Sequence, residues 1–192
     1  MNYLLLALSW IIFYTLHSVL AASKIKRILE GKLRNAYKWY RLGYTLVSIL
    51  LFLGIMVQAL LIPKSILFPK GDLTDYLGYM FAGFGTIILT KSSKNYSLKR
   101  FLGFEPSTKE DETLVTTGLY SKIRHPLYAG LVLIFLGYFL FSGTVTAVVH
   151  LACLLLYLPF GIYFEEKKLV NQFGEAYQKY KLAVPSLIPR LW

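Results

Sequence analysis

The sequence is poor in charge, in cysteine and in histidine. Charged residues make up 16% of the 192 positions, against about 25% in a typical soluble domain. The single cysteine, Cys153, excludes an intrachain disulfide and lies in an apolar run, where we expect it to pack as a small apolar group. The three histidines, His17, His125 and His150, lack the spacing of metal ligands, so we expect neither a metal nor a haem site.

Apolar residues are abundant instead. They form 56% of the chain, whereas soluble domains are about 45–50% apolar. The excess lies in long runs, so we predict an all-α integral membrane helical bundle with five transmembrane helices. We treat residues 1–192 as one membrane domain, with three spans in residues 1–89 and two in residues 90–192. The expected spans are 3–22, 42–62, 73–89, 126–141 and 144–164.

Two features predict how these spans pack. The fourth span would measure about 24 Å, less than the ~30 Å of a hydrocarbon core. Either its outer tip or its cytoplasmic start must therefore be drawn inward and covered by protein. In the third span, Gly78, Ala82 and Gly85 recur at helical spacing, which predicts a small-residue face that a neighbouring helix can approach closely.

Lysine and arginine are distributed unevenly along the chain. Of the 21 basic residues, successive connectors and the C-terminal tail carry seven, two, seven, none and five. Positive connectors face the cytoplasm, so we predict an external N-terminus and a cytoplasmic C-terminus. The net charge of +11 does not indicate a nucleic-acid partner, because these residues lie in loops between apolar runs rather than on one continuous face. After Glu165, the stripe of Leu169, Phe173, Tyr177 and Tyr180 predicts an amphipathic cytoplasmic helix.

A basic pair precedes the fourth span. Arg124 and His125 stand before Pro126, which suits the first position of a helix. Unpaired backbone amides at a helix start favour an anion, so a carboxylate or phosphate could bind there. The same residues are also typical of basic anchors at a membrane interface, and the triplet alone leaves both interpretations open.

An acidic pair is expected to close the fifth span at the same cytoplasmic face. Acids at a helix C-terminus oppose the helix dipole, so Glu165 and Glu166 should gain something in return. Pairing with Arg124 and binding a cationic group are two such gains. The alternative is a solvated charge patch shared with Lys167 and Lys168.

The two remaining histidines lie inside predicted spans. His17 is near the cytoplasmic end of the first span and is expected to cap a helix or line a cavity. His150 is a functional candidate by its position in the membrane, but we favour a neutral imidazole hydrogen-bonded to a neighbouring helix. Pro159 and Gly161 predict a kink or a close backbone approach, which would open a pocket beside Glu165.

Several motifs from residue 118 onward resemble a known superfamily. They are G-L-Y-S-K-I-R-H-P-L-Y-A-G at 118–130, E-E-K-K-L at 165–169, F-G-E-A-Y-Q-K-Y at 173–180 and V-P-S-L-I-P at 184–189. In this order they are similar to the isoprenylcysteine carboxyl methyltransferase and phospholipid methyltransferase superfamily of membrane enzymes. The N-terminal half looks more like its bacterial branch with methanethiol S-methyltransferases, on the segments 16–24, 39–41 and 100–104.

This resemblance implies an S-adenosylmethionine-dependent methyltransferase in a bacterial inner membrane. Its acceptor would be a lipophilic thiol, an isoprenoid carboxylate or a lipid reached from the bilayer. His125 and Arg124 would face the methionine carboxylate, and Glu165 and Glu166 would hold the amino end or the sulfonium side. Arg124 and Glu166 are the expected catalytic residues. The expected cofactor-binding set is Gly118, Leu119, Tyr120, Arg124, His125, Tyr128, Gly130, Glu165 and Glu166.

Two other classes of function remain open at this stage. Some membrane reductases share a helical hairpin of this kind and use a reduced nicotinamide cofactor. An extended basic pocket for phosphates would favour that class. A non-catalytic membrane accessory protein would bind neither cofactor.

Overall fold

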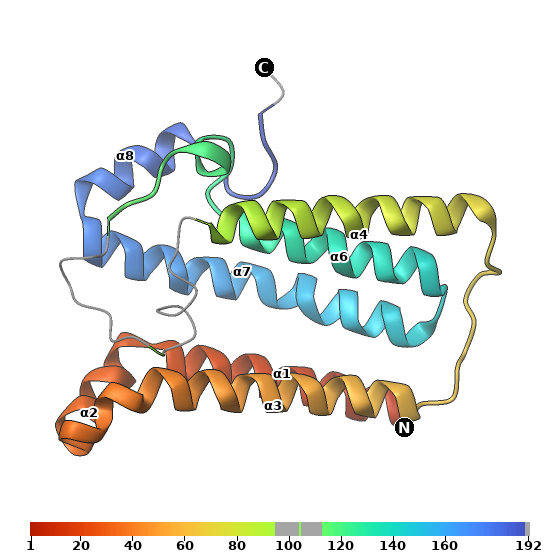
Figure 1. Ribbon diagram of the computed structural model, residues 1–192, viewed down its shortest axis with the longest axis horizontal. Coiled ribbons are helices and arrows are strands. Elements are labelled where there is room, and N and C mark those ends of the chain that lie inside the picture. Colours follow the sequence, from red (N-terminus) through yellow and green to blue (C-terminus); the bar gives the residue numbers. More distant parts are fainter. Residues whose placement is uncertain (95–103, 105–112, 191–192) are drawn as a thin grey trace.

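The computed structural model describes residues 1–94, 104 and 113–190, and these residues are mostly helical (Figure 1). Two short 3-10 helices accompany the α-helices, and the described residues contain no β-strand beyond one bridge between Ile66 and Thr144. The elements are α1 (Asn2–Ala21), α2 (Ser23–Leu33), η1 (Arg34–Trp39), α3 (Tyr40–Leu61), α4 (Asp72–Ser93), η3 (Gly118–Ser121), α6 (Pro126–Ser142), α7 (Val145–Phe173) and α8 (Glu175–Ala183).

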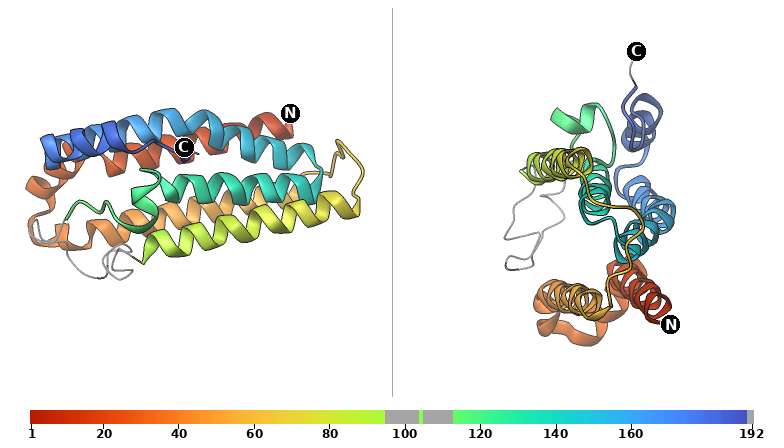
Figure 2. Two further views of the ribbon diagram at one scale, coloured as in Figure 1. Left: turned by 90° about the horizontal axis from the view of Figure 1, so that it is seen from above. Right: turned by 90° about the vertical axis from the view of Figure 1, so that its right-hand side faces the viewer.

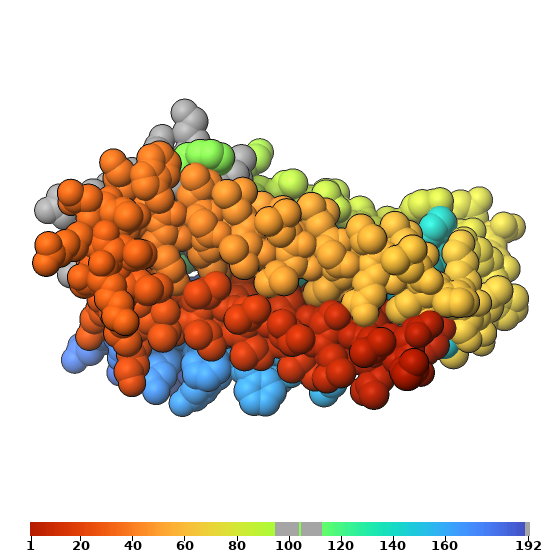
Figure 3. Space-filling view, turned by 90° about the horizontal axis from the view of Figure 1, so that it is seen from below, coloured from red at the N-terminus to blue at the C-terminus, as the bar shows by residue number. Residues whose placement is uncertain are grey.

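Apolar helices mark the chain as a membrane protein, as predicted. Among the described residues, three helical stretches are long and apolar enough to cross a bilayer: Asn2–Ala21, Ser23–Leu61 and Val145–Phe173. Helix α6 is apolar but shorter. Large apolar side chains are exposed along α1 and α3, which form the face shown in Figure 3. Such a face is stable against lipid but not against water.

The long helices lie roughly parallel to one another (Figures 1 and 2). Helices α1 and α3 pack together, α4 packs along α6, and α7 contacts both α6 and α1. The α2, η3 and α8 elements gather at one end of the bundle, and the N-terminus and the connector between α3 and α4 lie at the other. This grouping agrees with the predicted sidedness of the connectors, which itself stays a prediction.

The packing between α1 and α7 includes a buried hydrogen bond. Trp10 is 1% exposed, and its indole N–H donates to His150 Nδ1 at 2.8 Å. Because Nδ1 accepts, it carries no proton, so the imidazole is neutral with its hydrogen on Nε2. This arrangement confirms the prediction for His150. Cys153 packs against the same apolar cluster, also as predicted.

The small-residue face of α4 is confirmed by its contact with α6. A Cβ added to Gly85 would lie 2.6 Å from the carbonyl oxygen of Gly130, and one added to Gly137 would lie 2.6 Å from the backbone nitrogen of Ala82. Real Cβ atoms do not approach so closely, so these positions allow the two backbones to touch. The result is a tight α4–α6 pair that holds the start of α6 in a fixed place.

The tip of the α6–α7 hairpin is covered by the connector between α3 and α4. Gly143 has φ +60°, a conformation that glycine adopts without strain. Its carbonyl accepts from Leu67 N–H at 2.8 Å, and Val145 N–H donates to the carbonyl of Ser65 at 3.0 Å. This covering of Thr144, which is 8% exposed, is what the short fourth span predicted at one of its ends.

Three expectations about the connectors and tail were wrong. Residues 23–39 form α2 and η1 rather than a loop, because their apolar positions follow a helical stripe. Helix α7 does not end at residue 164 but continues to Phe173. The stripe from Leu169 to Tyr180 does not lie on one helix, because Gly174, with φ +55°, separates α7 from α8. Of the predicted loop 90–125, residues 95–103 and 105–112 lie outside the described residues, and residues 90–93 belong to α4.

Candidate functional site

The start of α6 is fixed by the C-terminal tail. Pro126 occupies the first turn and His125 is the N-cap, as the sequence predicted. The backbone N–H of Arg124 donates to the carbonyl of Pro185 at 2.9 Å, and that of His125 donates to the carbonyl of Ser186 at 3.0 Å. The tail therefore runs alongside this segment and satisfies two backbone donors just before the helix.

The two acids lie on a part of α7 that extends past its apolar segment. A helix of 29 residues is about 43 Å long, whereas residues 145–164 already span roughly 30 Å. Glu165 and Glu166 are therefore outside the apolar span but inside the helix. The expectation that Glu165 and Glu166 lie at a helix C-terminus was wrong, because about two more turns of α7 follow them, up to Phe173.

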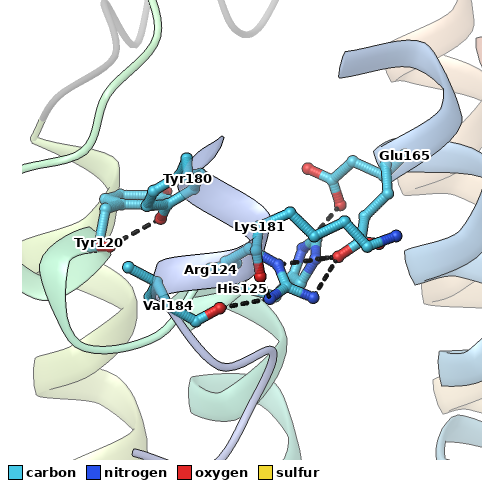
Figure 4. A network of polar contacts seen from close by, with 8 residues as sticks. Tyr120, Arg124, His125, Glu165, Tyr180, Lys181 and Val184 are labelled. Carbon is cyan, nitrogen blue, oxygen red and sulfur yellow. Dashed lines mark hydrogen bonds and ion pairs between the residues drawn. The ribbon is translucent and has the colours of Figure 1, made fainter. Parts of the chain in front are cut away.

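Glu166 is the centre of an ion cluster with Arg124, His125 and Lys181, which are labelled in Figure 4. Its Oε1 accepts from Arg124 Nη2 at 2.7 Å and from Arg124 Nε at 2.9 Å, and it lies 3.2 Å from His125 Nε2. Its Oε2 lies 2.6 Å from Lys181 Nζ. Burial alone would raise the pKa of Glu166, but the hydrogen bonds from Lys181, Arg124 and His125 outweigh it and lower the pKa to about 2.

The guanidinium of Arg124 forms its hydrogen bonds with protein groups. Besides its two contacts with Glu166, Nη1 donates to the carbonyl of Lys181 at 3.0 Å and to the carbonyl of Val184. The guanidinium is 10% exposed. Arg124 thus joins α7 to the end of α8 and the tail, and its contact with a ligand carboxylate, which the resemblance implied, would require some of these bonds to break.

Glu165 is the more exposed of the two carboxylates and can accept further hydrogen bonds. Its side chain is 44% exposed, and its Oε2 lies 3.4 Å from His125 Nδ1. The ring of Tyr128 stacks on His125 with centroids 5.7 Å apart, and its hydroxyl is within hydrogen-bonding reach of Glu165. His125, only 2% exposed in its side chain, lies between the two acids with one ring nitrogen toward each.

Tyr177 of α8 carries a buried hydroxyl without a hydrogen-bond partner among the described residues. The residue is 1% exposed. Burial raises the pKa of Tyr177, and the charge of Glu166, then those of Arg124 and Glu165, act on the hydroxyl. A buried hydroxyl without a partner costs about 1–3 kcal/mol of stability. A bound ligand that offered a hydrogen-bond acceptor to Tyr177 would remove this cost.

The 3-10 turn before α6 completes the surroundings. Gly118 begins η3 with φ +65°. Tyr120 is buried in this turn, and its carbonyl accepts a hydrogen bond from Tyr180 Oη at 2.6 Å. Leu119 lies between them and is half-buried. Gly130 is directed at α4, where it contacts Gly85. The structure therefore gives Gly130 a packing role, and its predicted contact with a cofactor stays a prediction.

Some members of the site were not found from the sequence. Lys181, Tyr177 and the segment 184–186 were assigned no site role, although their motifs were noted. In the sequence, Lys181 resembles an ordinary charged residue on an exposed helix. The turn at Gly174 places it in an ion pair with Glu166. The predicted meeting of Arg124 and His125 with the acidic pair is present in the structure.

Comparison with known proteins gives matches over the whole chain. The sequence profile of the phospholipid methyltransferase family matches residues 73–176. Methanethiol S-methyltransferase 2 of Bradyrhizobium diazoefficiens is 29% identical over 204 residues, which covers 100% of this chain and 73% of that enzyme. No solved structure matches the chain.

Two eukaryotic relatives match over shorter stretches. Protein-S-isoprenylcysteine O-methyltransferase of Schizosaccharomyces pombe is 39% identical over 82 residues, covering 42% of this chain and 34% of that enzyme. The protein of the same name from Xenopus laevis is 29% identical over 159 residues, covering 78% of this chain and 51% of that enzyme. The chain therefore spans only about a third to a half of these two relatives.

Proposed function

The chain belongs to the phospholipid methyltransferase family, as its motifs predicted, and from that premise we propose that it is an S-adenosylmethionine-dependent methyltransferase with a lipophilic acceptor. The proposal rests on two groups near the ion cluster of Glu166: the half-exposed carboxylate of Glu165 and the Tyr177 hydroxyl, which has no hydrogen-bond partner in the described part of the chain. An acid with free lone pairs and a hydroxyl with a free hydrogen are the groups that a zwitterionic amino acid needs.

The donor residues fit the methionine end of such a molecule. In this proposal Glu165 accepts from the ammonium group, and the Tyr177 hydroxyl donates to the carboxylate. The ring of Tyr128 and the backbone of residues 118–120 cover the donor, as the resemblance implied. When bound, the donor supplies an electrophilic methyl group on a sulfonium.

Arg124 and Glu166 act in this proposal by holding the frame. They join the start of α6, the extension of α7 and the tail, which are the elements that carry the donor-binding groups. His125 transmits that order to Glu165 through its Nδ1 contact. Fixing these groups contributes to rate through alignment of donor and acceptor, so both residues are positioning residues here.

The acceptor reaches this site from the bilayer. The cluster lies just beyond the apolar part of α7, at the end where α2, η3 and α8 gather (Figure 1). We propose five membrane spans, α1, α3, α4, α6 and α7, with the N-terminus outside and this end on the cytoplasmic side of a bacterial inner membrane. The basic connectors support that orientation. The name of the Bradyrhizobium relative supports a small thiol among the acceptors.

The test is methyl transfer by the purified protein. The protein in detergent micelles is incubated with methyl-labelled S-adenosylmethionine and either a bacterial lipid extract or a series of short alkanethiols, and labelled products are identified by mass spectrometry. We expect one acceptor class to be labelled at a rate proportional to protein concentration. Absence of labelled product with every acceptor, or oxidation of a reduced nicotinamide in a parallel assay, would contradict the proposal.

A further inference from the structure

Polar side chains also gather inside the membrane part of the bundle, where α1 and α3 meet. Tyr44 Oη lies 2.9 Å from both ring nitrogens of His17, and Ser48 Oγ lies 3.3 Å from His17 Nδ1. The ring of Phe13 stacks on the imidazole at 5.8 Å between centroids. Ionisable side chains within a membrane span are rare and mark functional sites by default. We name His17, Tyr44 and Ser48 the inner polar cluster.

The hydroxyls of Tyr44 and Ser48 lie against the ring nitrogens of His17. Ser48 Oγ also donates to the carbonyl of Tyr44 at 2.9 Å. A neutral imidazole carries its proton on one ring nitrogen and leaves a lone pair on the other. A protic substrate that displaces the Tyr44 hydroxyl would reach that unprotonated nitrogen.

The inner polar cluster is continuous with the proposed donor site through tyrosines. Ser18, beside His17, hydrogen-bonds Tyr157 Oη at 2.9 Å, and the ring of Tyr157 packs against Gly161. Tyr128, next to Glu165, lies near Tyr157 and Tyr44. Tyr157 and Glu165 are eight residues apart on α7, about 12 Å.

We propose that the inner polar cluster forms the acceptor subsite for a small thiol, and that His17 is its general base. The inference rests on the proposed methyl transfer. The unprotonated ring nitrogen of His17 takes the proton of the thiol, and the thiolate sulfur forms a bond to the methyl carbon of the donor. The bond between that carbon and the sulfonium breaks, and its electron pair remains on the departing sulfur. The imidazolium then releases its proton to water.

The chemistry of the base selects the class of acceptor. A carboxylate acceptor is already ionised and needs no base. Imidazole, with an ordinary pKa of about 6.5, takes a proton from a thiol of pKa about 8.5 at a cost of roughly 10² in equilibrium, but from an ammonium of pKa about 10.4 at roughly 10⁴. A thiol is therefore the protonated acceptor that a histidine in this place serves best.

The other titratable groups near the cluster do not compete for this role. Tyr14 of α1, Tyr40 and Tyr44 of α3, and Tyr157 of α7 face it or its neighbours, and Arg41 acts on Tyr44 from the membrane boundary. The phenols have ordinary pKa values near 10 and the guanidinium near 13. Among the groups named, the imidazole of His17 is the one whose ordinary pKa lies nearest to neutral pH.

The test compares His17→Asn with His150→Asn, which alters the other buried imidazole at the Trp10 contact. Donor affinity is measured by equilibrium dialysis, and thiol methylation is followed from pH 6 to pH 9. A free thiol of pKa about 8.5 is only a few per cent ionised at pH 7. We expect His17→Asn to bind the donor normally, to be about 30-fold slower at pH 7, and to approach the wild-type rate at pH 9.

Ser48→Ala keeps the imidazole and provides a second variant should His17→Asn fail to fold. It should slow thiol methylation several-fold without changing donor affinity. A His17→Asn enzyme with the wild-type rate and pH profile, or one slowed equally at every pH, would overturn the base role while the proposed function stands. A wild-type protein that binds the donor and methylates only carboxylates would overturn the thiol subsite. Failure of the wild-type protein to bind the donor would instead remove the proposed function, and this inference with it.

Discussion

Replacing Glu166 by glutamine tests the ion cluster at its centre. The substitution keeps the shape of the side chain but removes the charge that Arg124, His125 and Lys181 share. The two cations, Arg124 and Lys181, then remain close together without their counterion. Because Glu166 is only 7% exposed, water can solvate the cations around it only in part.

The magnitude follows from the pKa of Glu166. Its contacts lower the pKa from the ordinary 4.5 to about 2, and at 1.36 kcal/mol per unit this corresponds to about 3 kcal/mol of stability at neutral pH. Removal of one partner from a buried ion pair costs about 3–5 kcal/mol in comparable cases. Lys181 is half-exposed, so its share is screened, and we expect a loss of about 3 kcal/mol.

The assay is equilibrium unfolding in detergent micelles, followed by circular dichroism at pH 7. Glu165→Gln is the matched control, because it removes the adjacent, 44% exposed acid and should cost less than about 1 kcal/mol. The folded pKa of Glu166 is below the unfolded one, so its contribution is complete above about pH 4.5 and is lost as the pH falls through about 2. The wild-type protein should lose this stability on acidification, and Glu166→Gln should not. Equal unfolding free energies for the two glutamine variants, or identical pH dependence of wild type and Glu166→Gln, would refute the reasoning.

Three further predictions concern separate contacts. Tyr177→Phe removes a buried hydroxyl without a described partner, so stability should be unchanged or higher, while donor affinity by equilibrium dialysis should fall about 5- to 10-fold; unchanged affinity would remove Tyr177 from the proposed donor site. Gly85→Ala should cost about 1–3 kcal/mol in an unfolding titration because its Cβ meets Gly130, whereas Gly83→Ala, with open space around it, should cost nothing, and equal effects would contradict the tight α4–α6 contact. Trp10→Phe leaves His150 Nδ1 without its donor, so thermal unfolding should reveal a loss of about 1–3 kcal/mol, and a wild-type melting temperature would contradict a structural role for that bond.

Much of the helical arrangement could be predicted from residue patterns. Runs of apolar residues marked five helices whose cores lie within α1, α3, α4, α6 and α7. Small residues at helical spacing predicted the α4–α6 contact, because close backbone approach requires the absence of a Cβ. The limits of α7 could not be predicted, because E-E-K-K-L-V-N-Q is polar enough to leave the bilayer and still favours a helix.

Part of the candidate site could also be predicted from the sequence, because it follows from the order of the helices. Arg124, His125, Glu165 and Glu166 could be placed together because a hairpin of two helices returns to the side on which it started. Lys181 and the tail at 184–186 could not, because their positions depend on the turn at Gly174 and on backbone hydrogen bonds to residues 124 and 125. Neither leaves a periodic pattern in the sequence. The burial of the Tyr177 hydroxyl away from any partner in the described residues likewise follows from tertiary packing alone.

Binding of the methyl donor to the purified protein tests the proposed donor site most directly. Labelled S-adenosylmethionine is titrated by equilibrium dialysis against the wild-type protein, Glu165→Gln and, as a control, Glu175→Gln, which changes an exposed acid in the first turn of α8. The account predicts saturable binding of one donor per chain, a loss of about tenfold or more in Glu165→Gln, and wild-type affinity in Glu175→Gln. No saturable binding by the wild-type protein, or equal affinity in all three, would contradict it.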